Sequence, residues 1–173
     1  MTLLFPGSFD PVTLGHVDIA TRASLVCSTL IVAVLHNPHK HTTFTLQERV
    51  NFLQDALGHI NNIKIVSFSG LLVQYAQDVG ATAIVRGVRN ARDLESEAAY
   101  AATNRVIGKG IETIFLPASP QVSHISSSIV REAATFASSF DHTVLSAMVT
   151  QCVHTALINR YNNNAKENEY VTR

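Results

Sequence analysis

The sequence is poor in cysteine, in charged residues and in long apolar runs, and each shortage excludes a class of protein. Its two cysteines, Cys27 and Cys152, lie far apart and form no C-x-x-C pattern. They therefore predict neither a disulfide framework nor a metal site, and we expect two buried thiols in a reducing compartment. The longest uncharged apolar stretch, residues 23–35, is too short to span a bilayer.

Acidic and basic residues are balanced in this sequence. The chain has 13 basic and 13 acidic residues and a formal net charge of zero, so nothing indicates binding to a nucleic acid through bulk charge. The first five residues have neither the basic region nor the cleavage pattern of a signal peptide. We expect a cytoplasmic protein with neither a membrane nor a nucleic acid as its partner.

The composition is typical of a globular protein, because 46% of the residues are hydrophobic and 15% are charged. A length of 173 residues predicts one domain. We place this domain at residues 1–161. A polar tail, residues 162–173, begins with three asparagines, and we expect it to fray.

Apolar patterns typical of buried strands alternate with helical patterns along most of the chain. The strand patterns cover residues 3–5, 30–35, 63–66, 82–85 and 113–116. Helical patterns cover residues 17–26, 45–57, 71–79 and 93–106, and a last one covers 144–161. This order predicts an α/β fold, a single-domain Rossmann-like, doubly wound parallel sheet of five strands with helices on both faces and a C-terminal helical extension. Ligands of such sheets bind at the carboxyl ends of the strands.

The stretch from Phe5 to His16 joins the first strand to the first helix. It contains two prolines and two glycines, Gly7 and Gly15, so the connection is tightly specified. We expect Gly7 to let the chain turn at the strand end, and Gly15 to leave room for a ligand at the first helical turn. Such a helix start suits a phosphate. The fingerprints G-x-G-x-x-G and G-x-x-x-x-G-K-[ST] are both absent.

His16, at this helix start, can donate a hydrogen bond to a phosphate oxygen. An isolated histidine would more often cap or pack the first turn. Its position in the pattern T-x-G-H, residues 13–16, behind a strand, a serine and two prolines, favours the phosphate contact.

Two further segments carry candidate anion-binding groups. Residues 125–128 read Ile-Ser-Ser-Ser and precede a helical pattern, so they offer hydroxyl and N–H groups, although an ordinary capped helix has the same appearance. Arg86 follows a buried strand, where a charge indicates an anion nearby, and Arg89 lies close behind it. The later charges, Arg92 and Glu95, are typical of a solvated face.

The motifs T-x-G-H, R-G-x-R and I-S-S-S together resemble the phosphopantetheine adenylyltransferase family of the nucleotidyltransferase superfamily, without apparent gaps over residues 5–132. The resemblance implies transfer of AMP from ATP to 4′-phosphopantetheine, giving dephospho-coenzyme A and pyrophosphate. It implies a catalytic role for His16 and an acceptor site formed by Ser8, Lys40, Leu72 and Arg86. The ATP site that it implies consists of Ser8, Phe9, His16, Gly87, Val88, Arg89, Glu97, Val122, Ser123, His124, Ile125, Ser126, Ser127 and Ser128.

The same resemblance implies a homohexamer, and Mg²⁺ carried on the nucleotide phosphates rather than by protein ligands. The histidines at 36, 39 and 41 lie in a proline-containing loop and only weakly suggest a metal site. Three residues depart from the family pattern. Leu14 replaces a commonly polar residue, Val122 stands where an aromatic is frequent, and Thr150 replaces a common proline.

Two alternatives stay open at this point. The chain could be a related nucleotidyltransferase that uses another phosphate acceptor or CTP, although the R-G-x-R and I-S-S-S forms favour phosphopantetheine and ATP. It could also be a nucleotide-binding regulatory module that has lost activity, but the presence of His16, Lys40 and Arg86 argues against this. The motifs supply no protein nucleophile, so catalysis would rest on positioning and charge stabilisation.

Overall fold

The structure is a computed structural model that describes residues 1–136 and 143–171, with residues 162–171 described by their backbone alone. Its centre is a sheet of five parallel strands in the order β3-β2-β1-β4-β5. The strands are β1 (Thr2–Gly7), β2 (Thr29–Leu35), β3 (Ile63–Phe68), β4 (Ala83–Val88) and β5 (Glu112–Pro117). The predicted doubly wound parallel sheet is confirmed. Strand order reverses between β1 and β4, and a ligand cleft is expected beside their carboxyl ends.

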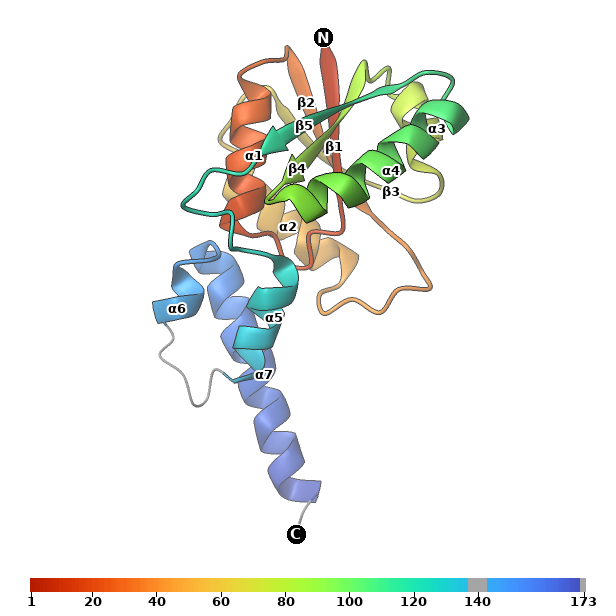
Figure 1. Cartoon of the computed structure of the whole chain (residues 1–173). Coiled ribbons are helices and arrows are strands. Elements are labelled where there is room, and N and C mark those ends of the chain that lie inside the picture. The colour runs from red at the N-terminus through yellow and green to blue at the C-terminus, as the bar shows by residue number, and fades with distance from the viewer. Residues whose placement is uncertain (137–142, 172–173) are drawn as a thin grey trace.

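Helices cover both faces of the sheet, as predicted (Figure 1). Residues of α1, α2, α5 and α7 share one hydrophobic core with β1, β2 and β4, whereas α3 contributes to a second core on the opposite face. The helices are α1 (Leu14–Ser24), α2 (Leu46–Leu57), α3 (Leu72–Asp78), α4 (Ala91–Ile107), α5 (Ser127–Thr135), α6 (Thr143–Ser146) and α7 (Gln151–Val171). The last three lie beyond the carboxyl ends of the strands (Figure 1).

Local sequence accounts for the elements that frame the site. In β2 the residues from Leu30 to Val34 are all buried, as expected for a strand covered by helices on both faces. The predicted capping box of α2 is present, because the Thr45 hydroxyl accepts from the N–H of Glu48 and the Glu48 carboxylate accepts from the N–H of Thr45.

The prediction of a single helix over residues 144–161 is wrong, because α6 and α7 are separate helices. Between them the carbonyl of Met148 accepts a hydrogen bond from the N–H of Leu14, at the start of α1. That carbonyl therefore stabilises a contact with the sheet domain instead of a helical turn. The predicted end at Tyr161 is also wrong, since the backbone of α7 continues to Val171. The division into a domain and a tail at residue 161 stays a prediction.

The two cysteines differ from each other. Cys27 lies half-buried in the turn before β2, where its thiol donates to the carbonyl of Ala23. Cys152 is exposed on α7, so the prediction of two buried thiols is wrong for this residue. Its position at the start of α7 places it on the solvent side of a helix whose buried residues are Val153 and Leu157.

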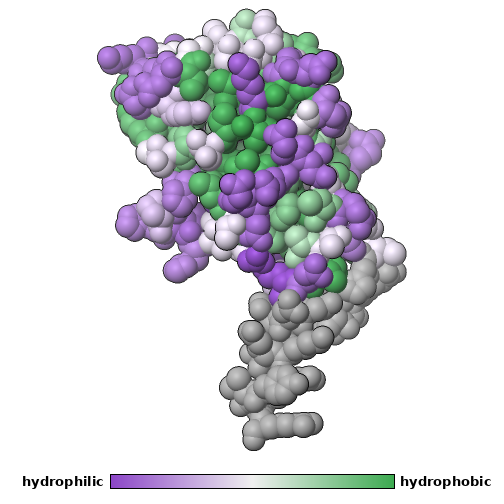
Figure 2. All heavy atoms as spheres, turned by 180° about the vertical axis from the view of Figure 1, so that it is seen from behind, coloured by the Kyte–Doolittle hydropathy of each residue, from purple (hydrophilic) through white to green (hydrophobic). Residues whose placement is uncertain are grey.

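Hydrophobic residues gather over the sheet-bearing part of the molecule when it is seen from the side opposite to Figure 1, with hydrophilic residues around them (Figure 2). The helix α4 contains no buried residue, and its exposed side chains include Leu94, Tyr100, Val106 and Ile107. None of the helices in the described part of the chain is long and apolar enough to cross a membrane.

Candidate active site

A cleft of about 530 Å³ lies at the carboxyl ends of β1 and β4, where the strand order reverses. Four connections border it, namely those from β1 to α1, from β2 to α2, from β4 to α4 and from β5 to α5. The cleft is lined by Phe5, Pro6, Gly7, Ser8, Thr13, Gly15, His16, Ile19, Lys40, Arg86, Gly87, Arg89, Asp93, Glu97, Ala118, Val122, Ile125, Ser126, Ser127 and Ser128.

Close packing explains two glycines of the cleft. A Cβ atom on Gly7 would lie 2.8 Å from the ring of Phe9, and one on Gly87 would lie 2.8 Å from the side chain of Ile19. Gly7 is the last residue of β1, at the strand end where the turn was predicted, and it also leaves the space that the ring of Phe9 occupies. A Cβ atom on Gly15 would lie in ordinary contact with the Thr13 hydroxyl, at 3.5 Å, and with the carbonyl oxygens of Val122 and Ile125, at 3.6 and 3.7 Å.

The orientation of His16 is fixed by the residue that caps its helix. The backbone N–H of Thr13 lies 3.1 Å from His16 Nδ1, and the Thr13 hydroxyl lies 3.0 Å from the same atom. A backbone N–H can only donate, so Nδ1 is an acceptor and the proton of the neutral ring is on Nε2. The edge-on contact with Phe9, at 5.1 Å between ring centroids, holds the other side of the ring.

Burial lowers the pKa of His16 to about 4, and the positive charges of Arg89 and Arg86 act in the same direction. The free protein therefore holds a neutral imidazole at pH 7, with Nε2–H as its hydrogen-bond donor. Such a donor can stabilise negative charge that grows on a phosphate during a reaction. It can do so without first releasing a proton.

Arg86 and Glu97 form a bidentate ion pair at the end of β4. Arg86 Nε and one terminal nitrogen each lie 2.6 Å from a carboxylate oxygen of Glu97. The remaining terminal nitrogen donates to the carbonyl of Pro6, at 3.1 Å, and so links β4 to β1. This geometry is the one in which a guanidinium binds the two oxygens of a carboxylate or phosphate.

Arg89 and Asp93 form a second ion pair of this kind, with Asp93 one turn before Glu97 on α4. Arg89 Nε lies 2.6 Å from one oxygen of Asp93, and a terminal nitrogen lies 3.1 Å from the other. Asp93 also accepts from the backbone N–H of Arg89, and these bonds from Arg89 keep the pKa of Asp93 below its ordinary value in spite of partial burial. Both arginines of the cleft are thus held by carboxylates from α4.

The start of α5 forms the opposite wall. Ser126 caps this helix by accepting from the N–H of Ile129, while Ser127 donates to the carbonyl of Pro11, at 2.8 Å. The hydroxyl of Ser128 accepts from Arg131, at 3.4 Å, so each of the three serine hydroxyls has a different partner within the protein. The N-termini of α1 and α5 both border the cleft, and each brings the positive end of a helix dipole.

Lys40 reaches the cleft from the connection between β2 and α2. Its ammonium lies 3.4 Å from the hydroxyl of Ser8. Among the ion pairs of the described residues none includes Lys40, whereas both arginines have carboxylate partners. Lys40 is therefore the cation of the cleft that is most available to an incoming anion.

A smaller cavity of about 190 Å³ adjoins the cleft and shares Arg86 and Glu97 with it. Leu72 lines this smaller cavity and not the main cleft. The remaining lining residues are Tyr100, Ala101, Asn104 and Thr113.

Most residues that were predicted for the site lie together in the main cleft. Besides Leu72, four do not line it. Phe9 and Val88 are buried behind it, with Phe9 supporting His16, while Ser123 and His124 belong to the loop before α5. The charges Arg92 and Glu95 are exposed on α4, as predicted.

Sequence reasoning missed several residues that hold the site together. Asp93 is one, and Asp10 is another, because its carboxylate accepts from the N–H groups of Thr43 and Phe44. Arg49 is only 2% exposed and donates to the carbonyl of Ser8. The sequence held a signal for Arg49. Its spacing from Phe52, Leu53, Ala56 and Leu57 is helical and places it on the apolar face of α2.

Protein ligands for a metal are not grouped in the described part of the chain. No three His, Cys, Asp or Glu residues lie together there in a way that could hold an ion. In the cleft, Asp93 and Glu97 are both engaged by arginines. The histidines at 36, 39 and 41 do not form such a set either.

Comparison with known proteins identifies the family. Residues 4–133 match the family model described as cytidylyltransferase-like. The chain is 42% identical over 158 residues to the phosphopantetheine adenylyltransferase of Alkaliphilus oremlandii, which covers 91% of this chain and 98% of the relative. It is 39% identical over 165 residues to that of Psychromonas ingrahamii, covering 95% and 99%, respectively.

Solved structures agree with the fold. Plasmodium falciparum nicotinic acid mononucleotide adenylyltransferase complexed with APC has a TM-score of 0.65 and 15% identity, and the match covers 93% of this chain and 95% of that one. The same enzyme complexed with NaAD has a TM-score of 0.61 and 17% identity, with the same coverage. From its sequence relatives and its matched model, this chain belongs to the phosphopantetheine adenylyltransferases, within the cytidylyltransferase-like family.

Proposed function

We infer that this protein is a phosphopantetheine adenylyltransferase, which transfers AMP from ATP to 4′-phosphopantetheine and releases dephospho-coenzyme A and pyrophosphate. One observation carries this conclusion, namely the identity of 39–42% with enzymes of this name over more than nine-tenths of the chain. The cleft supports it, because its groups are those that bind and stabilise phosphates.

The reaction needs no nucleophile from the protein. A phosphate oxygen of the acceptor, already ionised at neutral pH, attacks the α-phosphorus of ATP. A new P–O bond forms, the bond between the α-phosphorus and the bridging oxygen breaks, and pyrophosphate leaves with that oxygen. Catalysis then depends on alignment of the two substrates and on stabilisation of the charge that develops between them.

We assign the charge stabilisation to His16. Thr13 fixes its tautomer, so that Nε2–H is free to donate to a non-bridging oxygen of the α-phosphate. The lowered pKa of the ring keeps it in this neutral donor form before the nucleotide binds. As negative charge accumulates on the oxygen, the hydrogen bond strengthens, which lowers the barrier more than it tightens ATP binding.

We assign the acceptor half of the site to Ser8, Lys40 and Arg86. Lys40 and Ser8 are adjacent, and Arg86 lies at the boundary between the main cleft and the smaller cavity. A phosphate bound by these three groups would leave the pantetheine chain to enter the smaller cavity, which Leu72 lines. The mixture of apolar and amide groups in that cavity suits such a chain.

The nucleotide half would comprise Arg89, Glu97 and the start of α5. The carboxylates of Asp93 and Glu97 keep the two guanidinium groups in place before substrates bind. Substrate phosphates then share or replace these carboxylate contacts, since both bind a guanidinium through two oxygens. The residues of the predicted ATP site in the loop 122–125 would contact the base.

Mg²⁺ is the metal that we propose, bound to the nucleotide phosphates. The protein contributes no grouped set of ligands in its described part, and Mg²⁺ commonly keeps several water ligands and binds through substrate phosphates. When bound, the ion neutralises part of the phosphate charge. Lys40 and the two arginines would neutralise the remainder, and Ser8 would donate a hydrogen bond.

We also propose a homohexamer that acts in the cytoplasm. The exposed large hydrophobic side chains of α4 support self-association, because an interface would remove them from water. The two free thiols fit a reducing compartment. Light scattering coupled to gel filtration tests the assembly, and a mass six times that of the chain is expected.

The function is tested by measuring pyrophosphate release from ATP with a panel of acceptors. We expect release with 4′-phosphopantetheine, and none with pantetheine, which lacks the ionised nucleophile. Release with CTP in place of ATP, or only with nicotinamide mononucleotide, would assign the chain to another transferase of the same superfamily. Nucleotide binding without release under any condition would identify a regulatory module.

A further inference from the structure

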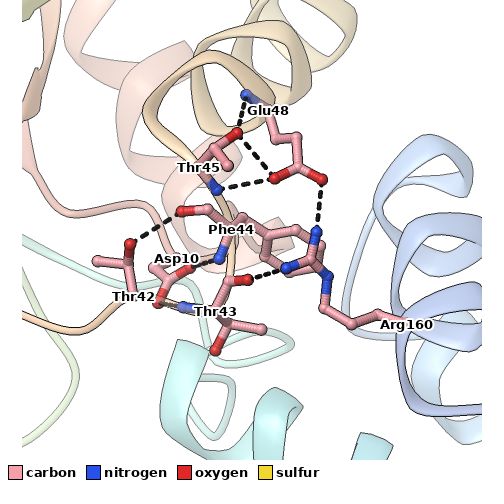
Figure 3. A network of polar contacts seen from close by, with 7 residues as sticks. All are labelled: Asp10, Thr42, Thr43, Phe44, Thr45, Glu48 and Arg160. Atoms are coloured by element: carbon pink, nitrogen blue, oxygen red, sulfur yellow. Dashed lines mark hydrogen bonds and ion pairs between the residues drawn. The ribbon is translucent and has the colours of Figure 1, made fainter. Parts of the chain in front are cut away.

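The connection between β2 and α2 carries Lys40, which is on the surface. Its ammonium contacts the hydroxyl of Ser8, and its backbone N–H donates to the carbonyl of Asn37 within the same loop. Its position therefore depends on how the rest of this connection is held. The contacts that hold it are concentrated at residues 43–48, where the loop enters α2 (Figure 3).

Asp10 holds one side of the loop. Its two carboxylate oxygens accept from the N–H of Thr43, at 2.8 Å, and from the N–H of Phe44, at 2.9 Å. Asp10 belongs to the same turn as Ser8, so these bonds join the two connections that bring Ser8 and Lys40 together. Phe44 is fully buried, which anchors the loop end in the core.

Arg160 of α7 holds the other side. One terminal nitrogen donates to the carbonyl of Thr43, and the other lies 2.6 Å from a carboxylate oxygen of Glu48. The guanidinium carbon lies 4.7 Å from the centre of the Phe44 ring, in a cation–π contact. Figure 3 shows Arg160 reaching from α7 to the same short segment that Asp10 binds.

Glu48 connects this contact to the start of α2. One of its oxygens accepts from the N–H and the hydroxyl of Thr45, and the other accepts from Arg160. Burial alone would raise the pKa of Glu48, but the bonds from Thr45 and the charge of Arg160 lower it overall. The ion pair is about one-third exposed on each side, so solvent weakens it and the carbonyl and ring contacts matter as well.

We infer that Arg160 is a positioning residue for Lys40, acting through Thr43, Phe44 and Glu48. The inference rests on the proposed role of Lys40 at the acceptor phosphate. Arg160 lies outside residues 4–133, the part that matches the family model. The C-terminal helix of this chain therefore contributes to substrate binding without touching the substrate.

The test compares three variants with the unmodified enzyme. Arg160→Gln removes the charge but keeps a polar side chain, and Arg160→Lys restores the charge without the planar fork. The matched control is Arg105→Gln, which breaks the exposed ion pair of Arg105 with Glu112, away from the cleft. Steady-state kinetics with each substrate varied, and amide hydrogen exchange of residues 40–44, are measured for all of them.

We expect Arg160→Gln to raise the KM for phosphopantetheine on the order of tenfold, the effect of about one charge-assisted hydrogen bond. The KM for ATP should change less than twofold, and exchange of the amides of Thr43 and Phe44 should accelerate. Arg160→Lys should recover part of the acceptor KM, while Arg105→Gln should behave as the unmodified enzyme in every measurement.

The outcomes separate the inference from the function on which it rests. An unmodified enzyme that does not use phosphopantetheine would overturn the proposed function. An active Arg160→Gln enzyme with an unchanged acceptor KM and unchanged amide exchange would overturn the inference alone. Equal increases in the KM for both substrates would also overturn it, since Arg160 would then serve the fold in general.

Discussion

One backbone contact decides what His16 can do. Because the N–H of Thr13 points at Nδ1, the proton of the neutral ring is on the nitrogen that remains free for a ligand. The same helix cap that starts α1 thus prepares the proposed catalytic donor. Neighbouring cations and burial keep the ring neutral, so the donor is available over the physiological pH range.

Replacing His16 with alanine should lower kcat far more than it weakens ATP binding. The loss of one donor to a developing oxyanion typically costs about 3 kcal/mol, or on the order of a hundredfold in rate. Steady-state kinetics and isothermal titration with ATP measure the two effects, and circular dichroism checks the fold. Near-normal turnover in a folded variant would mean that His16 is structural.

The lowered pKa of His16 also predicts how stability depends on pH. Its folded-state pKa of about 4 lies below the ordinary value of 6.5, so between these values the unfolded chain binds a proton that the folded protein does not. Stability should therefore fall as the pH is lowered from 6.5 to 4. For a fully buried histidine, this pKa difference would lower the free energy of unfolding by about 3 kcal/mol. The ring of His16 is half-buried, so the decrease should be smaller.

Urea denaturation of the unmodified protein and of His16→Gln, at several pH values between 4 and 7, measures this contribution. Acidic groups with lowered pKa values, such as Asp18 and Glu48, also reduce stability in acid, but they do so in both proteins. As the pH falls, the free energy of unfolding of the unmodified protein should decrease relative to that of His16→Gln. Parallel curves would contradict the assignment of a neutral His16.

Arg86→Lys should raise the KM for phosphopantetheine by more than about tenfold and leave ATP affinity nearly unchanged, because a lysine cannot bind two oxygens through a planar fork. Arg105→Lys, at an exposed ion pair on α4 outside the cleft, is the control. Kinetics with each substrate varied in turn give the answer. If ATP affinity collapsed while acceptor binding survived, the two halves of the site would have been assigned the wrong way round.

Helix starts organise the site as much as single residues do. The N-termini of α1 and α5 face the cleft, and the N-terminus of α2 fixes the loop that carries Lys40. The N-termini of α1 and α2 also contact the C-terminal part of the chain. Met148 binds the start of α1, and Arg160 binds the start of α2. The capping residues therefore contribute both to helix stability and to the placement of ligand-binding groups.

Thr45→Ala removes one half of the capping box of α2 and should cost about 1 kcal/mol of unfolding free energy. Urea denaturation measures the change, with an unchanged slope expected. Thr103→Ala is the matched control, because this threonine is exposed in the middle of α4 and alanine is a better helix former there. Equal stability of the two variants would contradict a stabilising cap at Thr45.

The whole molecule is divided by its sheet into a large core and a small one. The large core includes residues of α1, α2, α5 and α7, and therefore joins the C-terminal helices to the strands that carry the site. Among the described residues, the small core includes one helix, α3, while α4 buries none of its residues. The exposure of α4 in the single chain is consistent with the proposed assembly through this helix.

Two substitutions compare a buried position of the large core with an exposed position on α4. Leu53→Ala, at a position with no exposed surface in the large core, should lower the unfolding free energy by about 3 kcal/mol. Val106→Ala, at a residue that is 82% exposed on α4, should change it by less than about 0.5 kcal/mol in a monomeric protein. Denaturation of both variants at low protein concentration measures the difference. A large loss at Val106 under these conditions would place it inside the folded core.

The hydrophobic periodicity of the sequence, with its capping residues and glycines, was enough to predict the parallel sheet and its helices. The five strand patterns, the capping box at Thr45 and the glycines near His16 are local features, and the elements that they predict depend mainly on neighbouring residues. The motif residues could also be expected to meet, because all of them follow strands and parallel strands end at one edge.

Only the tertiary structure decided which partners those residues have. The pairing of Arg86 with Glu97, the tautomer of His16 and the reach of Arg160 to Thr43 depend on side chains that folding brings together from different elements. The break between α6 and α7 has the same origin, because the carbonyl of Met148 binds an N–H of α1 that lies more than a hundred residues earlier in the chain. Local patterns carry no information about such distant contacts, since a hydrogen bond forms with whichever group the fold places opposite.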